Sequence, residues 1–306
     1  MCKRCWPSMG LKRSVSNSML RGLWLAVLAA LALTSCSKPA AVHPALWLVE
    51  GPGGQKAWLF GTIHALPQPV NWHSAKIDAA LAQADRLVLE VAKLNDDAGT
   101  AQIFAGLAES PGLPPLRQRV PDKLQDDLGA ALKQDGFAAN ALDRYETWAA
   151  ALMLQNAAMA AGQSDSANGI DRALLRGWTK PVDEFEGAAA QLAIFDRLPE
   201  PAQRALLAAT LAGGADDLAQ TRKLEQAWAD GNLALVDKET NADFLNNPDL
   251  RATLLVGRNH AWMGKLTGLL IRGAHPFVAV GLAHLVGSEG LPALLSAQGY
   301  TVTRVQ

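Results

Sequence analysis

The sequence predicts a mixed α/β (α+β) fold, with a central mixed β-sheet formed by strands from both ends of the chain and a large helical insertion between them. Short apolar runs bounded by turn residues lie near the two ends, within residues 46–91 and 276–305. Most of residues 121–272 instead carries the apolar spacing of helices. Because strand, helix and strand alternate at both ends, we expect the terminal strands to share one sheet.

The first 35 residues have the features of a signal peptide of the lipoprotein type. They contain five basic residues and no acidic residue, and an apolar stretch follows at 23–33. This stretch is shorter than the roughly 20 apolar residues that span a bilayer. The segment Leu33-Thr34-Ser35-Cys36 resembles a bacterial lipobox, in which cleavage precedes a cysteine that is then acylated. The alternative is an ordinary signal peptide with a cysteine there by chance.

Cys36 is therefore the expected lipidation site, and residues 36–45 would form a short tether to a domain at 46–306. Ser37 follows the cysteine, and a residue other than aspartate at this position predicts sorting to the outer membrane. We expect a lipid-anchored, periplasm-facing protein of the bacterial cell envelope.

The mature chain is acidic, and its cysteine content excludes several mechanisms. Without the first 35 residues, 23 basic residues stand against 29 acidic residues, a net charge of about −6. This balance gives no support for a nucleic-acid partner, which requires a basic face. Cys2 and Cys5 lie in the removed segment, so the domain has no thiol for a disulfide, a catalytic thiolate or a metal ligand. Any metal site must use His, Asp and Glu.

The first part of the domain predicts a hairpin, a helix and a buried strand. Residues 46–50 and 57–60 are apolar runs joined by a glycine-rich turn, and the second run leads into Gly61-Thr62-Ile63-His64. Apolar residues four apart favour a helix at 74–84. Residues 86–91 form an apolar run that ends near the acidic Glu90.

The middle of the domain is predicted to be helical, with one further strand. Pro121 suits the first position of a helix at 122–134. A long Ala-rich helix is expected at 139–161, another helix opens at 168–171, and residues 180–186 indicate a strand that ends in an acid. Residues 187–272 are expected to be nearly all helix, interrupted at Pro201, Gly213-Gly214, Gly231 and Pro248.

The last part of the chain returns to strands and repeats the Gly-x-x-His pattern. A buried strand at 276–281 leads into Gly281-Leu282-Ala283-His284, and a helix at 291–298 and a strand at 300–305 follow. Gly61 and Gly281 are expected to break their strands into turns with unusual backbone angles and a close approach of a ligand.

Four ionisable residues follow predicted strands: His64, Glu90, Glu186 and His284. In open α/β sheets the active crevice lies outside the carboxyl ends of the strands, so these side chains are expected to converge. Two imidazoles and two carboxylates suit a metal site or a metal-free acid–base set. The residues alone leave both possibilities open.

Arg258 and Asn259 follow an apolar helical run and offer a guanidinium and an amide to a carboxylate or a developing oxyanion. A surface salt bridge at a helix end is the alternative that the sequence alone favours. Asp171 suits either a helix cap or a place in the site, and the cap is the favoured interpretation. We expect His260 on a helix surface.

With these motifs in this order, the chain resembles the TraB/GumN family, the TraB/PrgY group that is related to the Tiki proteases. The resemblance extends from Leu46 to Val305. It rests on residues 58–64, 87–90, 169–171, 180–182 with Glu186, 258–259 and 280–287. The order and spacing of the set are specific, although each motif alone is common. One departure is Phe185-Glu186-Gly187 where relatives have Leu-Glu-Thr, so the acid is kept but its neighbours differ.

The resemblance implies a metal-dependent hydrolase, with a peptidase acting on peptides or proteins of the cell envelope as the expected case. His64, His284 and Glu90 would hold a divalent ion, either Mn, Co or Zn. Such an ion lowers the pKa of a bound water and polarises a peptide-like carbonyl.

Glu90 and Glu186 would then act as catalytic carboxylates, and Arg258 and Asn259 would orient the substrate. Two alternatives use the same cleft. In one, the chain is a lipid-anchored binding protein that sequesters a peptide or saccharide without turnover. In the other, the same four ionisable residues catalyse acid–base chemistry without a metal.

Overall fold

The computed structural model describes residues 42–162, 164–242 and 244–306, and every element below belongs to these residues. These residues belong to one compact unit. The predicted signal peptide and Cys36 lie outside the described residues. The end of the predicted tether, residues 42–45, packs onto the domain, because Val42 is buried and its N–H donates to the oxygen of Asn71 at 3.3 Å. None of the described helices is long and apolar enough to cross a membrane.

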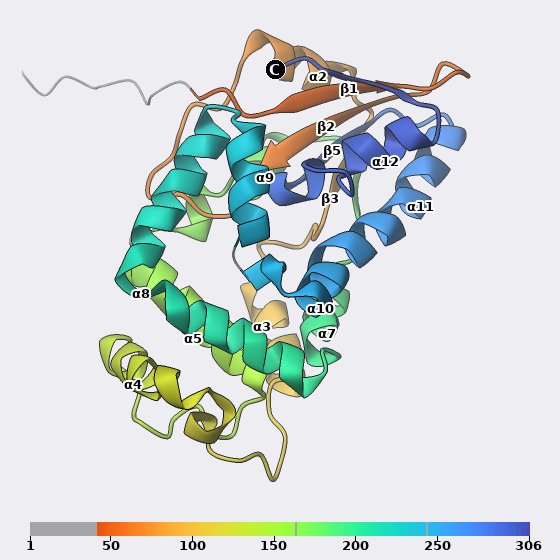
Figure 1. Cartoon of the computed structure of the whole chain (residues 1–306). Coiled ribbons are helices and arrows are strands. Elements are labelled where there is room, and N and C mark those ends of the chain that lie inside the picture. The colour runs from red at the N-terminus through yellow and green to blue at the C-terminus, as the bar shows by residue number, and fades with distance from the viewer. Residues whose placement is uncertain (1–41, 163, 243) are drawn as a thin grey trace, which may run out of the picture. The chain divides into compact units, whose positions relative to one another are not determined.

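A six-stranded mixed sheet combines strands from both ends of the chain (Figure 1). Its order is β4-β3-β5-β2-β1-β6. The four strands from β4 to β2 run parallel, whereas β1 is antiparallel to both of its neighbours. This arrangement confirms the predicted fold class. The strands are β1 (Leu46–Glu50), β2 (Lys56–Thr62), β3 (Arg86–Leu89), β4 (Val182–Glu184), β5 (Pro276–Gly281) and β6 (Thr301–Arg304).

The C-terminal strand β5 lies in the middle of the sheet, between β3 and β2. Both β2 and β5 are buried along nearly their whole length, as expected for parallel strands covered on both faces. In their register, Gly61 pairs with Val280 and Thr62 with Gly281. The two Gly-x-x-His segments therefore leave the sheet side by side, although they lie at opposite ends of the sequence.

The first of two hydrophobic cores surrounds the sheet. It joins Phe60 and Phe277 of the central strands to Ile77, Leu266 and Leu291 of flanking helices. The helices that contribute to it are α2 (Ala75–Gln83), α6 (Ile170–Gly177), α11 (Gly257–Ile271), α12 (Leu291–Ala297), α9 (Leu233–Ala242) and the end of α8 (Glu200–Ala229).

The second core lies within the helical insertion, below the sheet in Figure 1. It contains the fully buried Trp148 and Leu207. Helix α8 reaches both cores, because Leu207 belongs to this core and Trp228 belongs to the core around the sheet. The helices of the insertion are α3 (Asp97–Leu107), α4 (Gln125–Gln134), α5 (Thr147–Ala161), α7 (Ala188–Asp196), α8 (Glu200–Ala229) and α10 (Pro248–Arg251).

The predicted long helix at 139–161 is wrong in its first part. Helix α5 begins at Thr147, and the residues before it form turns. Tyr145 makes an antiparallel bridge with Glu109, and the Glu146 N–H donates to the oxygen of Ala108 at 2.7 Å. These contacts at the end of α3 hold the backbone away from helical geometry, so tertiary contacts override the helix propensity of the Ala-rich sequence.

Three smaller differences concern glycine and proline. Helix α8 continues through Gly213-Gly214, since glycine costs only about 1 kcal/mol relative to alanine in a helix. Pro201 lies in the first turn of α8, where proline is tolerated. Pro121 precedes the 3-10 turn Asp122–Leu124, and α4 itself begins only at Gln125.

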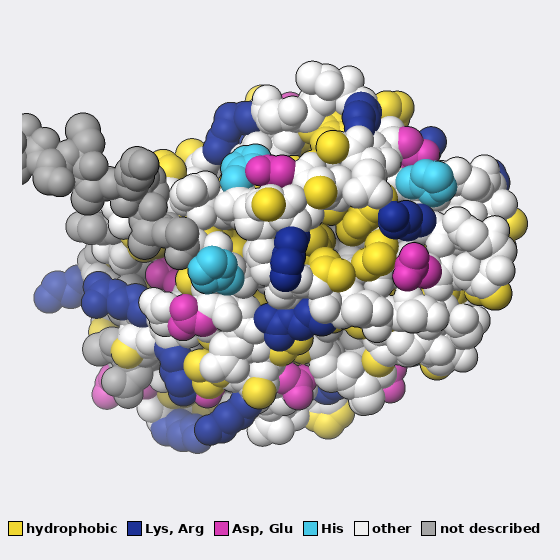
Figure 2. All heavy atoms as spheres, turned by 90° about the horizontal axis from the view of Figure 1, so that it is seen from above, with side chains coloured by type: hydrophobic (Ala, Val, Ile, Leu, Met, Phe, Trp, Pro, Cys, Tyr) yellow, Lys and Arg dark blue, Asp and Glu magenta, His cyan; other side chains and the backbone are white. Residues whose placement is uncertain are grey.

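Figure 2 shows the face of the molecule that points upward in Figure 1. Over the middle of this face the Lys and Arg side chains lie apart from one another, with acidic, hydrophobic and uncharged groups between them. This face is therefore mixed in charge and does not present one basic patch.

Candidate active site

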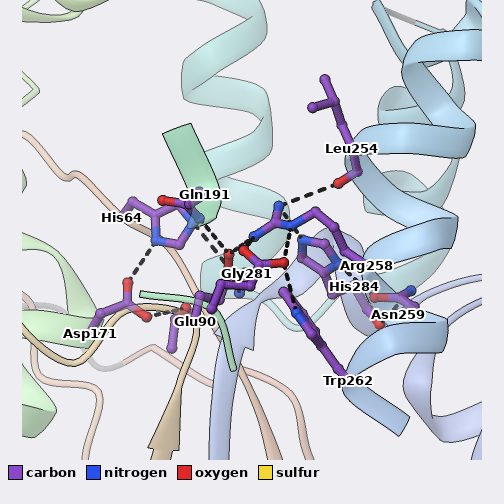
Figure 3. A network of polar contacts seen from close by, with 12 residues as sticks. His64, Glu90, Asp171, Gln191, Leu254, Arg258, Asn259, Trp262, Gly281 and His284 are labelled. Carbon is purple, nitrogen blue, oxygen red and sulfur yellow. Dashed lines mark hydrogen bonds and ion pairs between the residues drawn. The ribbon is translucent and has the colours of Figure 1, made fainter. Parts of the chain in front are cut away.

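The carboxyl ends of four neighbouring strands bring the predicted ionisable residues to one edge of the sheet (Figure 3). His64 follows β2, Glu90 directly follows β3, and Glu186 lies two residues beyond β4. His284 lies in the 3-10 turn Leu282–Leu285 that follows β5. Arg258 enters this edge from the start of α11.

The two glycines of the Gly-x-x-His segments do not adopt unusual backbone angles, so that prediction is wrong. Gly61 lies within β2, and Gly281 ends β5 with φ −50° and ψ 134°. Both glycines instead allow close packing. A Cβ on Gly61 would lie 2.4 Å from a methyl carbon of Leu282, and one on Gly281 would lie 3.2 Å from His64 Nε2. The close approach is therefore made by the protein's own side chains.

His64 is held by a carboxylate from α6. Its Nδ1 lies 2.8 Å from Asp171 Oδ2, and the Thr62 hydroxyl donates to Asp171 Oδ1 at 2.7 Å. Since a carboxylate can only accept, Nδ1 of His64 carries the proton. Its Nε2 lies on the opposite side of the ring, 4.0 Å from Glu90 Oε1. Gly169 lets α6 come this close, because a Cβ there would lie 2.2 Å from the oxygen of His64.

The His64 ring is the solvent-facing member of this group. Its side chain is 63% exposed, whereas those of Asp171 and Glu90 are 9% and 8% exposed. The Asp171 carboxylate raises the pKa of His64 to about 9, and Glu90 acts in the same direction. Water that reaches the ring screens part of this attraction.

The guanidinium of Arg258 has an acceptor for every N–H. Nε donates to Glu186 Oε1 and Nη2 to Glu186 Oε2, each at 2.9 Å. Nη2 also donates to Glu90 Oε2 at 2.6 Å. Nη1 donates to the oxygen of Leu254 at 3.3 Å and to His284 Nε2 at 3.2 Å. Because a guanidinium has five N–H donors, none remains for a substrate in this arrangement.

The Arg258 side chain is therefore largely buried and bonded to several groups of the site, and the prediction of a surface salt bridge is wrong. Its side chain is 12% exposed. A π-helical turn, Ala252–Val256, joins α10 to α11 directly before it, and π-turns often occur at functional sites. The Gly257 N–H donates to the oxygen of Ala252 in this turn. A Cβ on Gly257 would lie 2.9 Å from that oxygen, so glycine permits the wide turn that aims Arg258 at the sheet edge.

Glu90 is a buried carboxylate that stays ionised. Its Oε1 accepts the Gly281 N–H at 2.8 Å, and its Oε2 accepts from Arg258. Burial favours the neutral form, but the charges of His284, His64 and Arg258 and the Gly281 N–H outweigh it and lower the pKa of Glu90 to about 2. His284 contributes a charge only when its ring is protonated, so His64 and Arg258 are the cations that act near neutral pH.

His284 is buried and neutral. The Asn259 amide nitrogen donates to the oxygens of Glu289 at 2.7 Å and of His284 at 3.4 Å. The amide oxygen is therefore the acceptor that lies 2.7 Å from His284 Nδ1, which must carry the proton. Nε2 then accepts from Arg258. Burial lowers the pKa of His284 to about 3, and the cations Arg258 and His64 act in the same direction.

Sequence reasoning missed two contributors to the site and favoured the wrong role for a third. Asp171 makes no capping bond in α6, so the favoured cap interpretation is wrong and the alternative place in the site holds. The Gln191 amide donates to Glu90 Oε2 at 3.3 Å. The Trp262 indole donates to Glu186 Oε1 at 2.9 Å. A pattern that could have indicated Trp262 is its position four residues after Arg258, on the same helix face.

Two histidines outside the site pair with surface carboxylates. His260 is exposed, as predicted, and its Nε2 lies 3.2 Å from Glu289 Oε2. His73 is also exposed, and its Nδ1 lies 2.5 Å from Asp78 Oδ1.

The three predicted metal ligands do not present three unshared donor atoms. Nε2 of His284 and Oε2 of Glu90 both accept from Arg258, and Oε1 of Glu90 accepts the Gly281 N–H, so of these atoms His64 Nε2 alone accepts no hydrogen bond. In the part of the chain that the structure describes, no group of three or more His, Cys, Asp or Glu side chains is placed to hold a metal ion. The arrangement therefore does not fit the predicted ion unless Arg258 moves, and metal binding stays a prediction.

One family model and two similar proteins each align with most of the chain. The model of the TraB/PrgY/gumN family matches residues 45–304, a range that contains every residue of the candidate site. The chain is also similar to proteins named "Uncharacterized protein YbaP" from Shigella flexneri and from Escherichia coli (strain K12). Each is 27% identical over 248 residues, which cover 80% of this chain and 89% of the relative. No solved structure matches the chain.

Proposed function

The chain belongs to the TraB/PrgY/gumN family, and on this premise we propose that it is a hydrolase of peptide-like substrates in which His64 performs the acid–base step. One observation carries the proposal. The exposed His64 ring stands between the buried carboxylates of Asp171 and Glu90 at the carboxyl edge of the parallel strands. A histidine positioned in this way contributes about 10²–10⁴-fold to a hydrolysis rate.

In the proposed reaction, water attacks the carbonyl carbon of an amide bond. Because its pKa is about 9, His64 is mostly protonated near neutral pH, and only its neutral fraction, which grows with pH, has Nε2 free to act as the base. In that form His64 Nε2 takes one proton from the water as the C–O bond forms, and Asp171 stabilises the imidazolium through Nδ1. The tetrahedral intermediate then releases its amine as the C–N bond breaks, and His64 returns the proton to the leaving nitrogen. The ionised Glu90, 4.0 Å from Nε2, helps to hold the ring and the water in place.

Arg258 has a positioning role in this proposal and does not contact the substrate. Its five N–H groups are all engaged, so it fixes Glu90, Glu186 and His284 relative to one another. Asn259 similarly fixes the tautomer of His284. The predicted substrate-orienting roles of Arg258 and Asn259 are thereby replaced, within this proposal, by roles inside the protein.

The divalent ion implied by the family resemblance is not used in any step of this proposal. Mn, Co or Zn would need ligand atoms that Arg258 now occupies on His284 and Glu90. If such an ion binds after Arg258 moves, the chemistry it supplies is a bound water of lowered pKa. Chelation of the purified protein distinguishes the two forms of the proposal.

A peptide or protein of the cell envelope remains the proposed substrate class, and anchoring through Cys36 the proposed localisation. Small residues before Cys36 and Ser37 after it support outer-membrane anchoring. Replacement of Cys36 by alanine should move the protein from the membrane fraction to the soluble fraction of cells. A Cys36→Ala protein that stays in the membrane fraction would contradict a lipid anchor on this residue.

The central experiment incubates the purified protein with a peptide mixture and identifies new peptide termini by mass spectrometry. We expect cleavage by the natural sequence and a loss of at least about 10²-fold in His64→Ala, because the acid–base group is gone. The variant should keep its folded circular dichroism spectrum, since the His64 side chain is largely exposed.

His73→Ala is the matched control, because His73 is also an exposed histidine paired with an aspartate but lies outside the site. Its cleavage rate should equal that of the natural sequence. Full activity in His64→Ala would refute the role of His64. Specific peptide binding without any cleavage would favour the alternative of a binding protein that sequesters its ligand.

A further inference from the structure

Trp262 is a fully enclosed side chain that contacts three members of the candidate site. It lies on α11, four residues after Arg258, and is 1% exposed. Its indole N–H donates to Glu186 Oε1 at 2.9 Å. The same carboxylate oxygen accepts from Arg258 Nε, so the indole and the guanidinium share one acceptor.

The faces of the Trp262 ring are also occupied. Phe185 stacks on it with ring centroids 4.9 Å apart and an interplanar angle of 8°. The Arg258 guanidinium carbon lies 4.8 Å from the ring centroid, a cation–π contact. The His284 ring lies 4.3 Å from it at an angle of 42°. The Trp262 ring therefore packs against the Arg258 guanidinium and also covers the His284 imidazole with an apolar surface.

We infer that Trp262 is a positioning residue for the proposed reaction, which holds Arg258 between Glu90 and Glu186 and keeps water out of this part of the site. The inference rests on the proposed function for its catalytic consequence. Its structural part stands on the contacts of Trp262 with Glu186, Arg258 and His284.

The Arg258 guanidinium is held in its plane by its hydrogen bonds and by the ring of Trp262. Its acceptors lie beyond the ends of three different strands and in the π-turn before α11. These hydrogen bonds fix the positions of the guanidinium nitrogens only while the acceptors themselves stay in place. Trp262 fixes one acceptor, Glu186, by a hydrogen bond and covers the guanidinium by its ring. Without it, water would compete for both groups.

Two variants of Trp262 separate the hydrogen bond from the ring. Trp262→Phe keeps an aromatic ring and removes the N–H, whereas Trp262→Leu removes both. We expect kcat for peptide cleavage to fall roughly 10-fold in Trp262→Phe and roughly 100-fold in Trp262→Leu. Misplacement of the reacting groups by about 1 Å costs about 100-fold in rate. KM should stay within about twofold of the natural value, since the buried indole does not reach a substrate.

Trp148→Phe provides the matched control. Trp148 is fully buried in the second core, and its indole N–H has no partner among the described residues. Its replacement perturbs a core tryptophan without touching the site. We expect unchanged kcat in this variant, although its free energy of unfolding is lower. Equal loss of kcat in Trp148→Phe and Trp262→Phe would overturn the inference.

A readout that needs no substrate distinguishes this inference from the proposed function. The Arg258 Nε–H should give a nitrogen-15 resonance that is protected from solvent exchange, because it donates to buried Glu186. We expect protection to be lost in Trp262→Leu, to be reduced in Trp262→Phe and to persist in Trp148→Phe. Unchanged protection in Trp262→Leu would overturn the positioning role. An inactive natural protein with this pattern would refute only the hydrolase proposal.

Discussion

The two Gly-x-x-His segments look alike in sequence but carry histidines of opposite character. His64 is largely exposed, and its Nδ1 bonds to the carboxylate of Asp171. His284 is buried, and its Nδ1 bonds to the amide oxygen of Asn259. A carboxylate favours the protonated ring, whereas a neutral amide in a dry environment favours the uncharged ring. The partner, supplied by a distant helix, decides what each histidine can do.

One sequence motif therefore serves two tasks in this molecule. The first segment places an ionisable ring on the exposed side of the sheet edge, where the proposed reaction would use it to exchange protons with a substrate. The second places a neutral acceptor under Arg258, where it completes the hydrogen bonds of the guanidinium. This contrast leads to the expectations that follow, beginning with the change that should reduce cleavage most.

Replacement of Asp171 by asparagine should have the largest effect, because it gives His64 the kind of partner that His284 has. We expect the pKa of His64 to fall from about 9 toward its ordinary value of 6.5, as followed by NMR titration of the ring protons. Cleavage at the optimal pH should fall roughly 100-fold, since the imidazolium formed during the reaction loses its stabilising carboxylate. A His64 pKa that stays near 9 would contradict the assigned pairing.

The same pairing predicts a sign for the pH dependence of stability. A histidine whose pKa is raised by folding stabilises the protein fully below pH 6.5, and this stabilisation is lost as the pH rises through about 9. The stability of the natural protein should therefore fall between pH 6.5 and 9 relative to Asp171→Asn. Urea unfolding at both pH values measures the difference.

Replacement of Asn259 by aspartate makes the converse exchange. At pH 7 the variant should be less stable by about 1–3 kcal/mol, because the amide donors to Glu289 and His284 are lost. The low pKa of His284, about 3, means that the natural protein loses stability as the pH falls below 6.5.

A carboxylate beside His284 Nδ1 should raise the pKa of His284 and make the loss of stability at low pH smaller. Urea midpoints at pH 7 and pH 4.5 test the expectation, because Glu90, with a pKa of about 2, stays ionised in the folded protein at both pH values. If Asn259→Asp loses as much stability between pH 7 and pH 4.5 as the natural protein does, burial alone sets the pKa of His284.

The two glycines should respond differently to alanine. In Gly281→Ala the new methyl group would stand 3.2 Å from His64 Nε2 and 3.4 Å from Glu90 Oε1, so we expect cleavage to fall roughly 10-fold. In Gly61→Ala the methyl group would meet Leu282, so we expect mainly a loss of stability.

Gly264→Ala serves as the control for both, because its Cβ would meet nothing within 4 Å on the exposed side of α11. It should leave activity unchanged and stability equal or slightly higher. Denaturant curves and cleavage rates together decide whether the two glycines have separate roles.

Chelation should produce the smallest effect if Arg258 keeps its place. Dialysis against EDTA is expected to change the cleavage rate by less than about twofold, because the proposed steps use His64 and not a bound ion. Metal analysis of the same samples provides the check. Loss of cleavage on chelation, restored by Mn, Co or Zn, would instead support the metal-dependent form of the hydrolase.

Much of the sheet could be predicted from the sequence, because apolar runs bounded by glycine and proline mark its strands. The edge that collects His64, Glu90, Glu186 and His284 followed from the rule on carboxyl ends. The partner of each histidine could not be predicted in the same way. Asp171 near a helix start usually caps that helix, and only the packing of α6 against the His64 backbone turns it toward the ring.

The role of Arg258 shows the same limit. Its acceptors come from the ends of β3, β4 and β5, and no local pattern near Arg258 contains them. The π-turn before it also depends on a single glycine whose neighbours give no periodic indication. Sequence periodicity reports which face of an element is apolar, whereas the burial of one charged side chain depends on the closed fold.

The place of β5 has a consequence for how the molecule is made. This strand separates β2 from β3 in the sheet, although it begins only at Pro276, whereas β3 already ends at Leu89. During synthesis the two earlier strands therefore exist without the strand that joins them into one sheet. Pairings between segments so far apart form slowly. His64 and Glu90 meet only after β5 has been synthesised, so the edge that carries the candidate site assembles after the helical insertion, and a chain truncated before β5 cannot form it.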